Sequence, residues 1–238
     1  MWRVVAASGL LALAACDGCE GPSPAPPAIP QVGSGTPDRP QLAPPTTATT
    51  ELRGAATVVD AAGATVVSVT FDGGAVRIAR GGAEQWGRVT SDGRARRYRD
   101  AAGNTIADVS LGGPVVVIRA PGGRVAWRFS VGQVVRIWAG EETGAPLHRI
   151  AEGRLYAGDR LLGEAIAEPE ALVIRDAAGE ERERVTVDLD GLATGAWALL
   201  LLDDMALPLR DVVLAELVAT LSNDARRPPS RGDAAVPR

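Results

Sequence analysis

Arginine side chains gather around one tyrosine in the middle of the chain. Arg94 and Arg96 are expected to share a strand face with Tyr98, because side chains two residues apart in a strand point the same way. Arg97 and Arg99 are then expected on the other face. Guanidinium groups bind phosphates and carboxylates through paired hydrogen bonds. The sequence therefore predicts a site for anionic lipid headgroups, phosphate or an acidic partner, or alternatively the ordinary charged solvent face of a sheet. Its residues are Arg88, Arg94, Arg96, Arg97, Tyr98 and Arg99.

Residue types suited to catalysis are few in this chain. His148 is the only histidine, so a Ser-His-Asp or Cys-His mechanism would have to use it, and no Gly-x-Ser-x-Gly motif precedes a helix. Asp203-Asp204 is the one candidate acid/base pair, with a polar break before a helix as the alternative. One histidine and two cysteines disfavour a metal centre or a disulfide framework. We expect no enzyme, no cofactor and no metal.

The first residues indicate export. Arg3 precedes an apolar run, Val4 to Ala15, that is too short to cross a bilayer. The run ends in Leu13-Ala14-Ala15-Cys16, which resembles the lipobox of bacterial lipoproteins. That resemblance covers residues 1 to about 17 and implies cleavage before Cys16, acylation of its thiol and a membrane anchor. We expect a protein of the bacterial cell envelope that faces the periplasm or the cell surface.

The net charge and the two cysteines indicate which partners and which cysteine chemistry to expect. Loss of residues 1 to 15 leaves 24 arginines against 29 acidic residues, a net charge of −5 that disfavours nucleic acid. The expected partners are the membrane, through the acyl anchor, and a lipid or an envelope protein. Cys16 and Cys19 form a Cys-x-x-Cys, but no second pair follows, so we favour acylation of Cys16 over a redox site.

Composition divides the chain into four parts. Residues 1–15 are expected to be a signal peptide, and residues 16–51 a disordered tether, because nine of the 17 prolines lie between positions 20 and 50. A single folded domain is expected over residues 52–222. The polar residues 223–238 are expected to be a disordered tail.

The folded domain is predicted to be mainly β. Short β-branched runs alternate with turn signals about every ten residues, such as Asp60-Ala-Ala-Gly63, Asp72-Gly73-Gly74 and Gly81-Gly82. In one run Val67, Val69 and Phe71 fall on the same face, which indicates a strand that is half buried. This pattern predicts an antiparallel meander that closes into a barrel or sandwich. The four tryptophans beyond residue 50, Trp86, Trp127, Trp138 and Trp197, are expected in its core.

The C-terminal part of the domain is predicted to be helical. Leu192 to Leu202 is apolar on all sides and is expected to be buried. After Asp203-Asp204, Pro208 opens a second, amphipathic pattern that places its charged residues, Asp211 and Glu216 among them, away from the apolar stripe.

A second resemblance concerns the fold. Asp188-Leu189-Asp190, followed by the apolar run Gly195 to Leu202 and Asp203, resembles the ending of proteins in the tubby C-terminal-like superfamily, which includes phospholipid scramblases and LURP-one proteins. For residues 52–222 the resemblance implies a closed antiparallel barrel around a hydrophobic helix. The helical pattern that continues beyond Asp204 departs from this family.

These observations favour a lipid-anchored, non-catalytic binding or structural module. The alternative is a carrier or sensor that holds an apolar ligand, such as a lipid, inside the barrel. The first hypothesis requires a filled core and a contact surface, whereas the second requires a cavity lined by valine and leucine.

Overall fold

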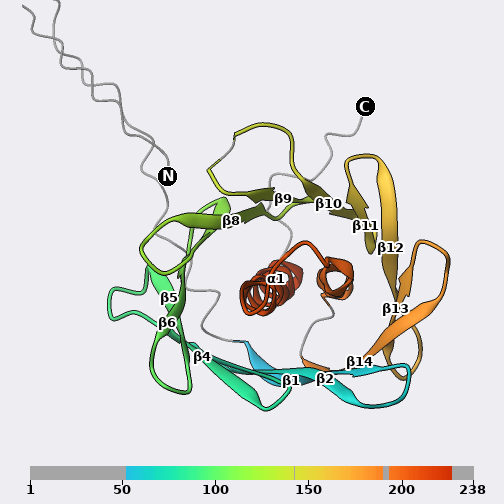
Figure 1. Ribbon diagram of the computed structural model, residues 1–238, viewed down its shortest axis with the longest axis horizontal. Helices are drawn as coiled ribbons and strands as arrows, with labels where there is room; N and C mark the ends of the chain where they lie inside the picture. The colour runs from blue at the N-terminus through green and yellow to red at the C-terminus, as the bar shows by residue number, and fades with distance from the viewer. Residues whose placement is uncertain (1–51, 142, 190–192, 227–238) are drawn as a thin grey trace, which may run out of the picture. The chain divides into compact units, whose positions relative to one another are not determined.

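The computed structural model describes residues 52–141, 143–189 and 193–226, which form fourteen antiparallel strands and two helices. The strands follow chain order around a closed barrel, because β1 pairs with both β2 and β14, and Figure 1 shows the ring around α1. The predicted mainly β fold with a C-terminal helix is therefore confirmed, and the barrel is the form adopted. The strands are β1 (Arg53–Asp60), β2 (Thr65–Asp72), β3 (Ala75–Arg80), β4 (Ala83–Val89), β5 (Ala95–Asp100), β6 (Thr105–Ser110), β7 (Val115–Arg119), β8 (Val125–Ser130), β9 (Val135–Ala139), β10 (His148–Ala151), β11 (Arg154–Ala157), β12 (Arg160–Ala167), β13 (Leu172–Asp176) and β14 (Glu181–Leu189).

Alternation along the strands decides which side chains face the lumen. In β2, Val67, Val69 and Phe71 are buried, as their spacing predicts, while Thr70 between the last two is exposed. The inward residues of the other strands join them in one hydrophobic cluster with the helices. Each fully buried valine or leucine contributes about 1.5–3 kcal/mol, so this cluster stabilises the closed barrel.

The repeated Asp-Ala-Ala-Gly segments form the expected hairpin turns. In the first, Asp60 Oδ1 accepts hydrogen bonds from the backbone N–H groups of Ala62 and Ala64, each at 2.9 Å. Gly63 takes a φ of 82°, a left-handed conformation that glycine adopts without steric cost. The carboxylate thus satisfies backbone donors that the turn would leave unpaired.

The turns alternate between the two ends of the barrel because consecutive strands are antiparallel. We name these ends after the first turn at each: the Asp60 end, with the turns after β1, β3 and the other odd strands, and the Asp72 end, with the turns after the even strands. β14 finishes at the Asp72 end, and η2 begins inside the barrel at the same end, beside the β8–β9 turn.

Two helices occupy the lumen as a hairpin. The 3₁₀ helix η2 (Thr194–Leu201) packs mainly on β10 to β13, and α1 (Leu209–Arg226) packs on η2, β3 and β6. The turn between the helices lies at the Asp60 end, since Asp204 within it pairs with His148 at the start of β10. Among the helices of the described ranges, none is both long and apolar enough to cross a bilayer.

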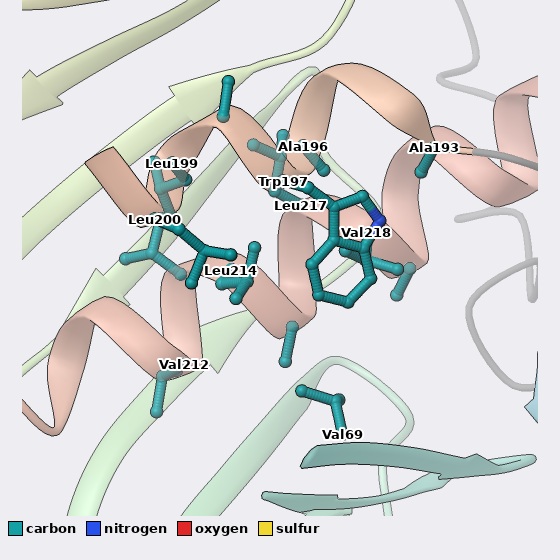
Figure 2. Packing of buried hydrophobic residues seen from close by; sticks show 14 of the residues in the cluster. Val69, Ala193, Ala196, Trp197, Leu199, Leu200, Val212, Leu214, Leu217 and Val218 are labelled. Carbon is teal, nitrogen blue, oxygen red and sulfur yellow. The ribbon is translucent and has the colours of Figure 1, made fainter. Parts of the chain in front are cut away.

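The largest fully buried side chain of the core is that of Trp197. Its indole lies on η2 beside Leu217 and Val218 of α1 (Figure 2), so the aromatic ring joins the two helices. The expectation for the other tryptophans is wrong in part: Trp127 packs against the core, but Trp86 is 39% exposed and Trp138 is half buried on the outer wall. Strand parity explains the difference, because the neighbours of these two residues face inward.

The second helix differs from its predicted amphipathic form. Every residue from Asp211 to Ala219 is buried, so the charged residues Asp211 and Glu216 face the inner wall and not solvent. The expected apolar stripe is present, but over these residues the other faces of the helix are buried as well. The helix also runs to Arg226, past Ser222, so residues 223–226 of the predicted disordered tail are helical. The predicted signal peptide, the predicted tether and residues 227–238 lie outside the described residues.

Candidate functional site

Charge is distributed unequally around the barrel. Residues 73–150, from the β2–β3 turn through most of β10, hold 12 arginines and 6 acidic residues. Residues 151–189, from the end of β10 through β14, hold 5 arginines and 10 acidic residues. We call these segments the basic arc and the acidic arc. Because neighbouring strands are also neighbours in the ring, this division in sequence places positive and negative charge on different walls.

The two arcs also differ in how many of their arginines form ion pairs. On the acidic arc most arginines have a carboxylate within 4.0 Å, as in the pairs Arg154–Glu164 and Arg175–Glu168. On the outer face of the basic arc several arginines have no carboxylate partner among the described residues. They are Arg88, Arg99, Arg119 and Arg136. The basic arc therefore presents positive charge that the protein itself does not neutralise.

A shallow groove of about 640 Å³ lies over β4 and β5 in this basic arc. Strand pairing positions its side chains: Trp86 lies opposite Arg99, and Arg88 lies opposite Arg97. Side chains directly opposite in an antiparallel pair have Cβ atoms about 5 Å apart, so the three arginines and the indole share one small surface. The groove is lined by Trp86, Arg88, Val89, Thr90, Arg97, Arg99, Asp100, Ala101 and Gly103.

The arginines of the groove differ in their partners. Arg97 donates to Asp108 on β6 at 2.7 Å, and this hydrogen bond and charge raise the pKa of Arg97. Arg99 has one long hydrogen bond, 3.4 Å, to the carbonyl of Gly103. Arg88 has no hydrogen bond or ion pair within the part of the chain that is described. Arg88 and Arg99 are thus held near each other with their guanidinium groups available to an external anion.

The indole of Trp86 is held by a cation-π contact on its other side. Arg77 of β3 lies opposite Trp86, with its guanidinium carbon 5.0 Å from the ring centroid, and also pairs with Glu84. Similar cross-strand contacts join Arg128 to Trp138 and Arg149 to Tyr156. Sequence reasoning missed Trp86 and Arg77, although the outward parity of Trp86 in β4 could have identified it.

The other residues of the predicted arginine patch lie elsewhere. Arg96 and Tyr98 face the lumen, as their shared parity implies, and both are fully buried. For these two residues the predicted external site and the alternative of a solvent-covering face are both wrong, because their partner is on α1 inside the barrel. Arg94 lies in the exposed β4–β5 turn and not in the groove lining.

Inside the barrel one carboxylate joins β5 to α1. Arg96 Nη1 and Tyr98 Oη donate to the same Glu216 oxygen, Oε1, at 2.6 and 2.7 Å. Burial opposes the charge on Arg96, but the adjacent Glu216 carboxylate outweighs it and raises the pKa of Arg96. Burial, reinforced by Glu216, holds the pKa of Tyr98 well above its ordinary value. Arg96 is therefore charged and Tyr98 is neutral, so both side chains can donate the hydrogen bonds that Glu216 accepts.

A second ion pair fixes the start of α1. Arg80, the last residue of β3, donates two hydrogen bonds of 2.8 Å to the carboxylate of Asp211. The carboxylate is 1% exposed and the arginine side chain 17% exposed. Bidentate pairing sets direction as well as distance, so α1 is oriented against the inside of the basic arc.

The structure separates the residues considered for catalysis into different contacts. His148 is 3% exposed and its Nε2 lies 3.0 Å from Oδ2 of Asp204, while Asp203 is fully exposed and 4.0 Å from Arg210. The two aspartates thus have different partners and do not converge. In the described ranges, no three histidine, cysteine or acidic side chains are grouped to hold a metal ion. Cys16 lies outside those ranges.

The fold and groove define a closed β-barrel with a helical hairpin in its lumen and an arginine-tryptophan surface on its outer wall. No protein-family model and no curated protein matches the chain. Among solved structures, the X-ray structure of a protein from Arabidopsis thaliana is similar over 43% of this chain and 78% of its own, with 12% identity and a TM-score of 0.31. A score this low does not establish a shared fold.

Proposed function

We propose that this protein is a lipid-anchored, non-catalytic binding module of the bacterial envelope, and that the groove over β4 and β5 binds a phosphate group. The observation that carries the proposal is the pair Arg88 and Arg99, which have no carboxylate partner among the described residues and flank the exposed Trp86. Bringing unneutralised cations together is unfavourable, so an anion that binds between them relieves their repulsion.

The chemistry of the groove favours phosphate attached to a larger molecule. Arginine donors form paired hydrogen bonds to phosphate oxygens, and an indole face packs against sugar or glycerol carbons. The source of the phosphate is either a soluble phosphate ester or an anionic phospholipid headgroup. For a protein anchored through Cys16, the lipid surface is the nearer source, and each basic residue near such a surface contributes about 1 kcal/mol.

The test uses residues 16–238 with Cys16→Ala, produced without residues 1–15, so that neither acyl chains nor the apolar run Val4 to Ala15 attaches the protein to lipid. Glucose 6-phosphate is compared with glucose by calorimetry, and vesicles of phosphatidylglycerol and phosphatidylcholine are compared with pure phosphatidylcholine by sedimentation. We expect binding only where phosphate carries net negative charge. Binding to glucose 6-phosphate identifies a soluble ester as a sufficient ligand, and binding to anionic vesicles alone identifies the lipid surface.

A matched pair of variants separates the groove from general charge. R88A/R99A removes the two groove cations and is expected to weaken binding tenfold or more. R160A/R182A makes the same change in net charge on the acidic arc, where both arginines are exposed, and is expected to bind normally. Equal loss in both variants, or normal binding by R88A/R99A, would refute a site in this groove.

The carrier hypothesis has no comparable support. An apolar ligand enclosed in the middle of the lumen would need space around Trp197, Leu199 and Val213, but these side chains and the inward strand residues form one packed cluster. The lumen is occupied by the chain's own η2 and α1. The filled interior accordingly favours the binding module, whose contact surface is outside.

A further inference from the structure

A separate pocket opens at the Asp72 end of the barrel, where η2 begins. Its volume is about 510 Å³, and its walls come from the β8–β9 turn, the start of β9, β10, the β10–β11 turn, the start of η2 and the later part of α1. Four aliphatic side chains line it: Val131, Val135, Ile150 and Leu221. Small residues keep it open, since a Cβ atom on Gly195 would lie 3.3 Å from Cγ2 of Ile150.

One ionisable residue belongs to the lining of this mainly apolar pocket. Glu152 has no ion pair or hydrogen bond among the described residues, and the other polar members of the lining are Gln133 and Thr194. A carboxylate beside apolar walls attracts a cation, and the aliphatic side chains favour an apolar group attached to that cation.

The backbone at Glu152 has a positive φ, a conformation that residues other than glycine rarely adopt. Glu152 and Gly153 form the two-residue turn between β10 and β11, with φ of 51° and 79°. Such turns favour asparagine, aspartate or glycine, because other side chains are strained at positive φ. Glu152 is the only described residue other than glycine with positive φ. An asparagine or a glycine would complete this turn with less backbone strain, yet the chain has a glutamate here, and its carboxylate lies at the pocket.

We propose that this pocket binds a small amphiphile with a cationic amine head and a short apolar chain. The amine pairs with Glu152, and the chain contacts the side chains of Val131, Val135 and Leu221. This site is independent of the phosphate groove, because the two share no lining residue and lie on different elements.

The probes are n-hexylamine, n-hexanol and hexanoate, which share a chain and differ in head-group charge. They are titrated into the full chain with Cys16→Ala, and binding is measured by calorimetry and by the methyl NMR signals of Val131, Val135 and Leu221. We expect hexylamine to bind about tenfold more tightly than hexanol, and hexanoate to bind most weakly. Equal affinity for amine and alcohol, or no shift of these methyl signals, would overturn the proposal.

Two variants test the role of the carboxylate. Glu152→Gln is expected to abolish the preference for amine over alcohol, whereas Glu170→Gln, at an exposed and unpaired glutamate in a turn at the same end, is expected to preserve it. Glu152→Gly is expected to lose the preference while raising Tm by a few degrees, since glycine relieves the backbone strain. A purely structural Glu152 would leave the preference intact in both variants at this position. That result would also overturn the proposal, whatever the phosphate groove binds.

Discussion

At the scale of the residue, Glu216 neutralises the only arginine that is fully buried among the described residues. Both side chains of the Arg96–Glu216 pair are 1% exposed. Glu216→Gln would remove the carboxylate to which Arg96 donates in the core, and removing one partner of a buried ion pair costs about 3–5 kcal/mol. We expect a corresponding loss in the free energy of unfolding, measured by urea denaturation.

The surface and double variants provide the controls for this prediction. Glu84→Gln removes the carboxylate of the exposed Arg77 pair and is expected to cost less than about 1 kcal/mol. R96M/E216M, which removes both charges, is expected to be more stable than Glu216→Gln alone. If the surface variant were as unstable as Glu216→Gln, burial of the charge would not be the cause.

A half-buried carboxylate, that of Glu183 on β14, opposes folding at neutral pH. Burial raises its pKa above the ordinary 4.5, against the opposing effects of Arg210, Arg80 and Arg182. The folded state then holds this proton more tightly than the unfolded state, so the associated stability is present below pH 4.5 and is lost as pH rises through the raised pKa. Glu183→Gln keeps a neutral side chain and should lose this dependence.

The measurement for Glu183 is the difference in unfolding free energy between variant and parent at pH 4 and pH 7. We expect the difference to shift in favour of Glu183→Gln on going to pH 7. The exposed Glu180→Gln serves as the control and should show no such shift. A difference that is constant with pH would contradict the expected role of Glu183.

At the scale of the element, β4 must leave room for the side chain of Tyr98, which extends from the inner face of the neighbouring strand β5. A Cβ atom on Gly87 would lie 2.6 Å from Cε1 of Tyr98, so only glycine leaves room for this ring to reach Glu216. Gly87→Ala is expected to displace Tyr98 and to destabilise the fold by about 1–3 kcal/mol. Thermal unfolding checks this, with Gly144→Ala as control because a Cβ there meets nothing within 4 Å. Equal Tm values for the two variants would rule out the steric argument.

Local signals explain which elements the sequence predicts correctly. The turns at Asp60, Asp100 and Asp176 follow from an aspartate that accepts backbone N–H groups within the same hairpin. The sequence signal for strands is weak over β10, β11 and β12, because His148–Ala167 is rich in arginine, alanine and glycine and lacks β-branched runs. Their strand state comes from pairing with neighbours in the closed ring.

Distance along the chain explains what the sequence could not predict about the candidate sites. Arg96 lies 120 residues from Glu216, and no local pattern shows that this arginine is buried with a carboxylate while its neighbours Arg97 and Arg99 remain outside. The parity of β5 separates the two groups correctly, but only the closed barrel decides which face is the lumen. The groove required a further fact, the opposition of Trp86 and Arg99 across two strands.

At the scale of the whole molecule, the proposed anchor and the basic arc would act together at a membrane. An acyl anchor keeps the domain at high local concentration near lipid, so the arginine groove needs only weak affinity for phosphate to remain occupied. Acylation and charge make separable contributions, because salt screens the arginines without weakening the apolar insertion of an acyl chain.

The prediction for the anchor uses the two cysteines of the chain. Cys16→Ala, expressed in a Gram-negative bacterium with labelled palmitate, is expected to incorporate no label, whereas Cys19→Ala is expected to incorporate it normally, because acylation is assigned to Cys16 alone. A protein that lacks residues 1–15 and carries Cys16→Ala, if it sediments with anionic membranes, should be released by about 0.5 M salt, since the Debye length is then roughly 4 Å. The acylated protein should stay bound, because the attraction of its acyl chains for the bilayer is not electrostatic. Label on Cys16→Ala would refute the proposed anchor, and release of the acylated protein by salt would show that charge alone holds the domain at the membrane.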